Sequence, residues 1–250
     1  MLLERDELLL GLRHLAVEAE SSHGRLVFVA GEAGVGKTTL VNAVAAEVAD
    51  RPMTVRRGGC DDLTTPAALG PVLEALPELD DALEEHVSVG RLSLFRRVRD
   101  LLAAGPTLLV LDDVHWADEA TLDLLRYLGR RIDGLPLLVV ATYRSEEVGS
   151  GHPLAATLGR LTSSPVVVRL QVPPLSAAAV RELAARAGSA LDADELFRTT
   201  GGNAFYVTEV LASRRERLPA TVRDAVLGRV ARLSADARTV LGAAAVLGQP

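Results

Sequence analysis

Two kinds of hydrophobic pattern alternate along the chain as far as residue 172. Short segments rich in apolar residues have the length of strands, and the segments between them repeat apolar residues every three or four positions, as helices do. The runs lie at residues 26–30, 53–57, 107–111, 137–142 and 166–170. The helical segments lie at residues 8–19, 38–49, 67–76, 92–103, 119–132 and 154–161. Apolar strands separated by helices predict an α/β fold with a parallel five-stranded sheet flanked by helices.

The pattern changes after Val172-Pro173-Pro174, where only helical periodicity remains. These later helical segments lie at residues 177–187, 193–199, 204–214, 220–232 and 235–247. We therefore expect a first domain at 1–172 and a second, all-helical region, with the two prolines at the hinge. Residues 248–250 directly follow an apolar stretch without a polar tail, so we expect the native protein to continue beyond them.

The amino-acid composition limits the kinds of core, partner and cellular compartment that this chain can have. Hydrophobic residues make up 48% of the chain but aromatic ones only 3%, which predicts an aliphatic core. The formal net charge of -6 argues against a nucleic-acid-binding surface. Cys60 is the only cysteine, so no internal disulfide can form, which fits a reducing cytoplasm. No apolar run approaches the ~20 residues of a membrane span, so we expect a cytoplasmic protein without membrane contact.

The segment GEAGVGKTT follows the first apolar run and opens the helix at 38–49. Its first eight residues match G-x-x-x-x-G-K-[ST], in which successive backbone N–H groups surround phosphate oxygens. Glycine suits such a loop because it allows close approach of the main chain and positive φ angles. We expect Lys37 to reach the β- and γ-phosphates and the Thr38 hydroxyl to ligate Mg²⁺. The predicted phosphate-binding residues are Gly31, Glu32, Ala33, Gly34, Val35, Gly36, Lys37, Thr38 and Thr39.

Two carboxylates, Asp112 and Asp113, follow the apolar run at 107–111. A P-loop protein needs an acid at this place to hold the metal through water, and Asp112 suits that role. Asp113 is then placed to orient or deprotonate the attacking water, as a catalytic residue. The plainer alternative is a strand followed by an acidic turn.

Arg144 is a further catalytic candidate, because it follows the next apolar run. Ligands of open α/β sheets bind beyond the carboxyl ends of the strands, where this cation could sense the γ-phosphate and neutralise charge during transfer. The alternative is a surface arginine paired with Glu146 or Glu147.

Three residues between these motifs have structural interpretations. We expect Trp116 to be a packing anchor, His115 to be a turn residue near the site, and Asp118 to be the N-cap of the helix at 119–132.

Taken together, LLVLDDVHWAD, ATYR and GGNAFYVTEVL resemble the ATPase module of the large LuxR-type transcriptional regulators. These belong to the signal-transduction ATPases with numerous domains (STAND), within the AAA-like P-loop proteins. The resemblance implies that the strand at 137–142 lies between the P-loop strand and the Asp112 strand. It also implies a helical lid at 173–216 and the start of a truncated winged-helix domain at 217–250.

The chain departs from that family at two places. The leading motif, usually Gly-Arg-Glu, is Glu4-Arg5-Asp6 here, and Leu3 and Arg5 are expected to flank the adenine. The lid motif, usually Gly-Asn-Pro, is Gly202-Asn203-Ala204, so the proline that stiffens the turn against the base is missing. We still expect Gly202 and Asn203 to contact the nucleotide.

The leading functional hypothesis is a regulatory switch that binds ATP or ADP with Mg²⁺ and hydrolyses ATP slowly. The resemblance adds further domains of the same chain as partners, namely the winged helix, helical repeats and a C-terminal helix-turn-helix. It also adds nucleotide-dependent self-association, and no direct nucleic-acid contact is expected from this segment. One alternative is an interaction module that holds nucleotide without hydrolysis. Another is a P-loop phosphotransferase, for which the helical region offers no acceptor site.

Overall fold

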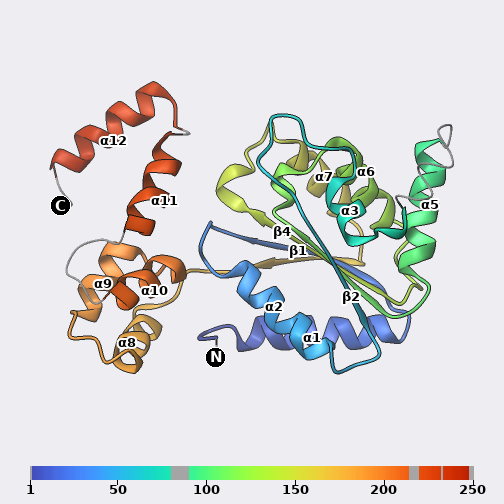
Figure 1. Ribbon diagram of the computed structural model, residues 1–250, viewed down its shortest axis with the longest axis horizontal. Helices are drawn as coiled ribbons and strands as arrows, with labels where there is room; N and C mark the ends of the chain where they lie inside the picture. The colour runs from blue at the N-terminus through green and yellow to red at the C-terminus, as the bar shows by residue number, and fades with distance from the viewer. Residues whose placement is uncertain (1, 80–89, 214–219, 232, 248–250) are drawn as a thin grey trace. The chain divides into compact units, whose positions relative to one another are not determined.

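The computed structural model describes residues 2–79, 90–213, 220–231 and 233–247. The chain divides into two compact units, Met1–Pro174 and Leu175–Pro250. The first unit contains the sheet and the helices packed on it, and the second, over its described residues, contains helices (Figure 1).

A sheet of five parallel strands forms the centre of the first unit. Its spatial order is β2-β3-β4-β1-β5, which confirms the expected parallel sheet and places β4 between β3 and β1. The strands are β1 (Arg25–Gly31), β2 (Thr54–Gly59), β3 (Thr107–Asp112), β4 (Leu137–Arg144) and β5 (Val167–Gln171). The register sets Gly31 opposite Arg144 and Gly59 opposite Asp112, so the predicted phosphate loop and acidic residues meet at the carboxyl edge.

Helices cover both faces of this sheet. The helices α1 (Asp6–Glu20) and α2 (Lys37–Val48) share one core with Val27 and Val29 of β1. On the other face, the helices pack with Leu26 and Phe28 of the same strand. They are α3 (Gly70–Ala75), α5 (Arg91–Leu102), α6 (Glu119–Leu128) and α7 (Pro153–Leu161) (Figure 1). The alternation along β1 explains its unbroken apolar sequence, because each face of the strand is buried.

The ends of α6 are set by local contacts. Asp118 accepts hydrogen bonds from the N–H groups of Ala120 (2.8 Å) and Thr121 (3.1 Å), which confirms the predicted N-cap. The helix ends at Leu128, earlier than the expected residue 132. Asp133 there pairs with His23 in an isolated β-bridge, which draws the chain away from the helical path.

The second unit contains five helices over its described residues. They are α8 (Ala177–Arg186), α9 (Ala193–Thr200), α10 (Ala204–Ser213), α11 (Ala220–Ala231) and α12 (Ala235–Leu247). The side chains of Ser176 and Asp192 cap α8 and α9, whose buried residues include Val180 and Leu196. The division of this unit into a lid and a winged-helix domain stays a prediction.

Candidate functional site

The loop between β1 and α2 has the backbone geometry of an anion cradle. Gly34 (φ 80°) and Gly36 (φ 104°) adopt left-handed conformations that favour glycine. At Gly31 a Cβ atom would lie 2.8 Å from the Val172 carbonyl oxygen and 2.9 Å from a Val35 methyl carbon, so only glycine fits. No side chain caps the N-terminus of α2, which leaves its first turn to receive a negatively charged group.

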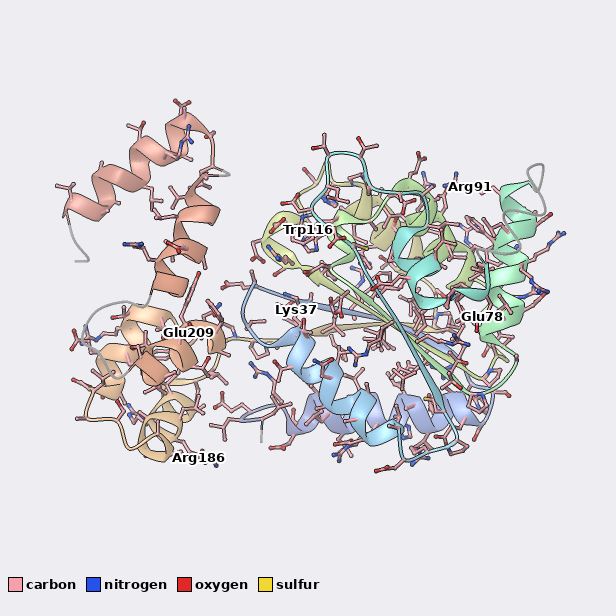
Figure 2. The ribbon with its side chains drawn as sticks, viewed as in Figure 1. Lys37, Glu78, Arg91, Trp116, Arg186 and Glu209 are labelled. Carbon is pink, nitrogen blue, oxygen red and sulfur yellow. The ribbon has the colours of Figure 1, made fainter. Side chains whose placement is uncertain are left out.

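Lys37 is folded back on this loop. Its Nζ donates hydrogen bonds to the carbonyl oxygens of Gly31 (2.8 Å) and Glu32 (2.9 Å), and its side chain is buried. Lys37 is labelled at the start of α2 in Figure 2. Thr38 and Thr39 follow in the first turn of this helix and are exposed. A phosphate that replaced these carbonyl oxygens would bind a Lys37 ammonium group that is already desolvated.

A threonine on β4 organises the acidic end of β3. The Thr142 hydroxyl donates to Asp112 Oδ1 at 3.0 Å and accepts from the Asp113 N–H at 2.9 Å. Asp113 has a left-handed φ of 53°, so the chain turns sharply after the strand. The carboxylates of Asp112 and Asp113 therefore point in different directions. Burial raises the pKa of Asp113, and the nearby Arg144 and Lys37 oppose that shift.

Arg144 is held by three neighbours. Its guanidinium donates to Glu147 Oε1 at 2.8 Å, lies 3.7 Å from Asp113 Oδ2, and stacks 4.5 Å from the centre of the Trp116 ring. The pairing with Glu147 that the sequence offered as an alternative is therefore present. It does not exclude the sensor role, which stays a prediction, because Arg144 also lies beside the candidate catalytic carboxylate.

His115 is more deeply placed than a turn residue at the edge of a site. Its fully buried side chain lies between two carboxylates, with Nδ1 3.8 Å from Asp113 and Nε2 3.6 Å from Glu147. Neither ring nitrogen makes a hydrogen bond to another described residue. Burial, together with the positive charges of Arg144 and Lys37, lowers the pKa of His115 to about 4. The ring is neutral at pH 7.

A contact that sequence reasoning missed joins Glu146 to the phosphate loop. The Glu146 carboxylate accepts a hydrogen bond from the Ala33 N–H at 2.8 Å, across 113 positions of the chain. A carboxylate on a loop amide has the charge and acceptor chemistry of a phosphate oxygen. A bound phosphate would therefore compete with the Glu146 carboxylate for the Ala33 N–H.

The residues of the loop and the acidic edge fit a nucleotide with a metal ion. The cradle and Lys37 suit its phosphates, and the prediction that Thr38 ligates Mg²⁺ and that Asp112 holds it through water stays open. Among the described residues there is no group of three metal-binding side chains. A P-loop site does not need one, because phosphates and waters complete the coordination of the metal.

The leading segment contacts the same loop. Arg5 is buried and donates to the carbonyl oxygens of Pro173 (2.6 Å) and Val35 (3.3 Å), while Leu3 is half-buried beside it in sequence. Glu4 adopts a left-handed φ of 55°, at the position where the resembling family has glycine. Contact of Leu3 and Arg5 with adenine stays a prediction.

Gly202 and Asn203 lie in the second unit, where they have structural roles. A Cβ on Gly202 would lie 2.0 Å from the Leu175 carbonyl oxygen, and its own carbonyl accepts from the Leu175 N–H at 2.8 Å. The Asn203 side chain is buried, and its carbonyl accepts the N–H of Val207. Their predicted contact with nucleotide remains a prediction.

Comparison with known proteins identifies the family. The sequence profile of the AAA ATPase domain matches residues 2–140, more than half of the chain. The chain belongs to the AAA ATPase domain family. Together with the loop geometry, this makes the first unit an AAA ATPase-like nucleotide-binding module. No curated protein matches the chain significantly.

Solved structures agree with the fold of this AAA ATPase domain. The Orc1 protein of Aeropyrum pernix in complex with DNA has a TM-score of 0.54 and 19% identity, over 96% of this chain and 71% of that one. A STAND protein with a tetratricopeptide repeat sensor from Pyrococcus horikoshii has a TM-score of 0.55 and 17% identity, over 93% and 33%. The replication initiator DnaA, bound to AMPPCP and single-stranded DNA, has a TM-score of 0.50 and 16% identity, over 87% and 64%.

This AAA ATPase domain thus spans about a third of the length of the STAND protein that it resembles.

Across the described parts of the chain, none of the helices combines the length and the apolar character required to cross a bilayer. Cys60 is buried, as expected for a small core residue, and burial raises the pKa of its thiol to about 12.

Proposed function

We propose that this AAA ATPase domain is a regulatory switch that binds ATP or ADP with Mg²⁺ and hydrolyses ATP slowly. In this proposal it is the ATPase module of a larger cytoplasmic transcriptional regulator, with the further domains and the nucleotide-dependent self-association that the sequence resemblance implies. The regulator context is supported by the motifs around Asp112, Arg144 and Gly202.

One observation carries the switch. Three groups expected to touch the phosphates already have a partner inside the protein: Lys37 on the loop carbonyls, Ala33 N–H on Glu146, and Arg144 on Glu147. A triphosphate must exchange these partners for its own oxygens, whereas a diphosphate leaves those of Arg144 in place. Binding of ATP is therefore coupled to a rearrangement after β4, and differential affinity for two arrangements is what a switch requires.

The same contacts explain slow turnover. Asp113, the candidate base, lies beside the cation of Arg144, which must be redirected to the phosphate before both can act. Thr38 and Asp112 would hold the metal ion, which supplies charge neutralisation at the phosphates when bound. Lys37 and the loop amides would fix the phosphate chain, and Asp113 would accept a proton from water.

The proposal is tested by calorimetry and single-turnover kinetics on the purified chain. We expect both nucleotides to bind with micromolar affinity, because the contacts of the P-loop are intact. Phosphate should be released at about 0.01 s⁻¹, which is well below the ~1 s⁻¹ at the low end of enzyme turnover. Asp113→Asn should slow release by about 100-fold, because general base catalysis contributes ~10²–10⁴-fold. Asp133→Asn, at the opposite edge of the sheet, is the matched control and should leave release unchanged.

Two results would contradict this account. A chain that ignores ATP and ADP in calorimetry would remove nucleotide binding altogether. Binding without any phosphate release, equal in wild type and Asp113→Asn, would instead favour the interaction module that holds nucleotide without hydrolysis.

A further inference from the structure

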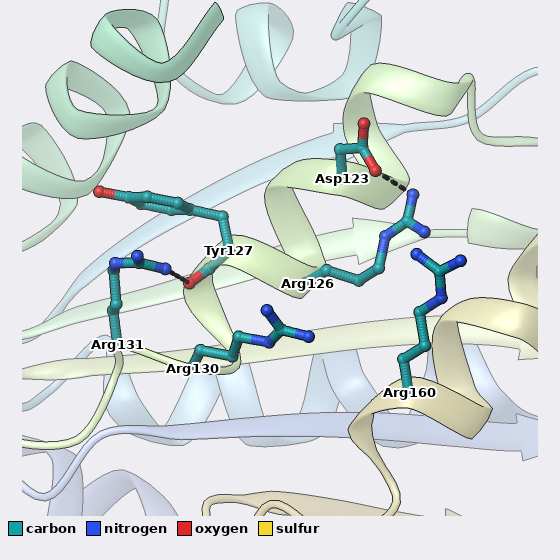
Figure 3. A pocket seen from close by; sticks show the side chains of 6 residues that line it. All are labelled: Asp123, Arg126, Tyr127, Arg130, Arg131 and Arg160. Carbon is teal, nitrogen blue, oxygen red and sulfur yellow. Dashed lines mark hydrogen bonds and ion pairs between the residues drawn. The ribbon is translucent and has the colours of Figure 1, made fainter.

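A second basic site lies at the amino edge of the sheet, far along the chain from the phosphate loop. Helices α6 and α7 run from the carboxyl edge back to the starts of β4 and β5, so their C-terminal ends meet at this edge. The Ser164 hydroxyl joins them by donating to the Gly129 carbonyl oxygen at 3.0 Å. Between the two ends lies a hollow of ≈ 240 Å³, which we call the arginine hollow. Its lining consists of Asp123, Arg126, Tyr127, Arg130, Arg131 and Arg160 (Figure 3).

The arginine hollow concentrates positive charge in an acidic chain. Four guanidinium groups face one carboxylate, Asp123, which also pairs with Arg91 at 2.8 Å. The lining alone therefore has a net charge of about +3, in a chain whose formal net charge is -6. Gathering like charges raises the free energy of the folded state unless an anion lies among them.

Contacts with helix ends explain three of the four arginines in this cluster. Arg126 and Arg160 lie in the last turns of α6 and α7, where a cation offsets the negative end of the helix dipole. Arg131 lies beyond the end of α6 but donates to the Tyr127 carbonyl oxygen at 3.5 Å, so it also contacts the C-terminal end of that helix. Arg130 makes no such contact with another described residue, so capping does not account for its position.

The four arginines also differ in how they are held. Arg126 pairs with Asp123, and Arg131 stacks 4.3 Å from the centre of the Tyr127 ring. Within the described ranges, Arg130 and Arg160 have neither a hydrogen bond nor an ion pair, and both are exposed. Figure 3 shows the guanidinium ends of Arg126 and Arg160 directed toward one another and Arg131 lying back against Tyr127. Asp123 occupies Arg126, and Tyr127 holds Arg131, so Arg130 and Arg160 are the lining arginines that, among the described residues, remain available to an anion.

We propose that the arginine hollow binds a compact soluble anion that carries two adjacent phosphate groups. Each guanidinium fork matches one phosphate bidentately, and the hollow offers two forks without a protein partner. Its volume is below the ~300 Å³ of sites for drug-sized ligands, which suits a diphosphate. A long nucleic acid strand is disfavoured, because it would extend from the hollow over the rest of this acidic chain, whose negative charges repel it within the Debye length of ~8 Å.

The test uses inorganic diphosphate as the probe and the Lys37→Ala chain as the background, so that the phosphate loop does not dominate the signal. Isothermal titration calorimetry should detect binding of diphosphate, and orthophosphate should bind more weakly because it occupies one fork. In the same background, Arg130→Gln/Arg160→Gln should weaken diphosphate binding by at least about 10-fold, since charge-assisted hydrogen bonds contribute ~1.5–3 kcal/mol. Thermal melting of each variant establishes that it is folded.

The matched control is Arg96→Gln/Arg97→Gln, which changes the net charge equally at two exposed arginines of α5. Equal binding in the two double variants, or no binding of diphosphate, would overturn the proposal. Binding of a single-stranded oligonucleotide without binding of diphosphate would also overturn it, in favour of a nucleic-acid contact. The result is independent of the nucleotide switch, because failure of that switch would appear as absent ADP binding in the wild-type chain.

Discussion

The two edges of the central sheet differ in whether their cationic side chains are paired with acceptors of the protein. At the carboxyl edge, Lys37 is buried and Arg144 half-buried, and both are bound to acceptors of the protein itself. At the amino edge, Arg130 and Arg160 are exposed, and the described residues provide them with no acceptor. A cation with an internal partner can be released by a ligand and so couples binding to rearrangement. A cation without one can bind an anion with little rearrangement of the protein.

The largest expected effect comes from Lys37→Ala. Removing this ammonium deletes charge-assisted hydrogen bonds to phosphate of ~1.5–3 kcal/mol each, so ATP affinity should fall by about 100-fold or more. Calorimetry with ATP measures it, and the exposed Arg97→Ala is the control. The comparison breaks if the same variant also loses diphosphate binding at the amino edge, because the two edges would then not be independent sites.

Glu146→Gln should have a smaller effect of the opposite sign. The substitution keeps an acceptor near the Ala33 N–H but removes a negative charge from the place of a phosphate. We expect ATP affinity to rise by about three- to tenfold, or ~1 kcal/mol, in calorimetry at low salt. Glu119→Gln, an exposed acid at the start of α6, is the control. A fall in affinity would mean that Glu146 supports the loop rather than competing for it.

The buried His115 predicts a pH dependence of stability. Its pKa is lowered to about 4 in the folded chain, from about 6.5 in the unfolded chain, so the unfolded state binds more protons between these values. The unfolding free energy should therefore fall as pH drops from 6.5 toward 4, by at most about 1.4 kcal/mol per pH unit.

Urea titrations of wild type and His115→Gln measure this slope. The variant should lose it, while the substitution of the exposed His14 by Gln should retain it. Asp113, whose pKa is raised, contributes the opposite slope in the acidic range of both proteins and does not account for the difference between them. Parallel pH profiles for wild type and His115→Gln would show that burial of His115 does not control stability.

The smallest expected effect concerns Glu4. A left-handed conformation costs a residue with a Cβ ~1–2 kcal/mol, and glycine avoids this at an entropic cost of ~0.5–1 kcal/mol. Glu4→Gly should therefore raise the unfolding free energy by at most about 1 kcal/mol. Glu4→Ala retains the Cβ and serves as the control, so equal stability of the two variants would exclude backbone strain as the cause.

The sequence predicted most of the fold, because the central strands β1, β3 and β4 are buried on both faces and are therefore almost entirely apolar. The expected strand at 107–111 is β3, extended by Asp112, and the expected order of the central strands was correct. The end of α6 was placed too late, since only the tertiary pairing of Asp133 with His23 shows where the chain leaves the helix.

The sequence placed candidate site residues only where local motifs exist. The phosphate loop and Asp112, Asp113 and Arg144 were named from residue types and spacing, and the structure brings them to one edge of the sheet, while their roles stay predictions. The contact of Glu146 with Ala33 was missed, because it joins distant segments without any pattern in either. The arginine hollow was also missed, since Arg130 and Arg160 belong to different helices and meet only at an edge of the folded sheet.

Arg5 gives the molecule a mechanical property of its own. One guanidinium group holds the carbonyl of Val35, in the phosphate loop, and that of Pro173, next to the last residue of the first unit. A change in the shape of the loop must stretch or shorten one of these two bonds. A change in loop shape on phosphate binding is thus transmitted through the Arg5 side chain to the backbone at Pro173, just before the chain enters the second unit.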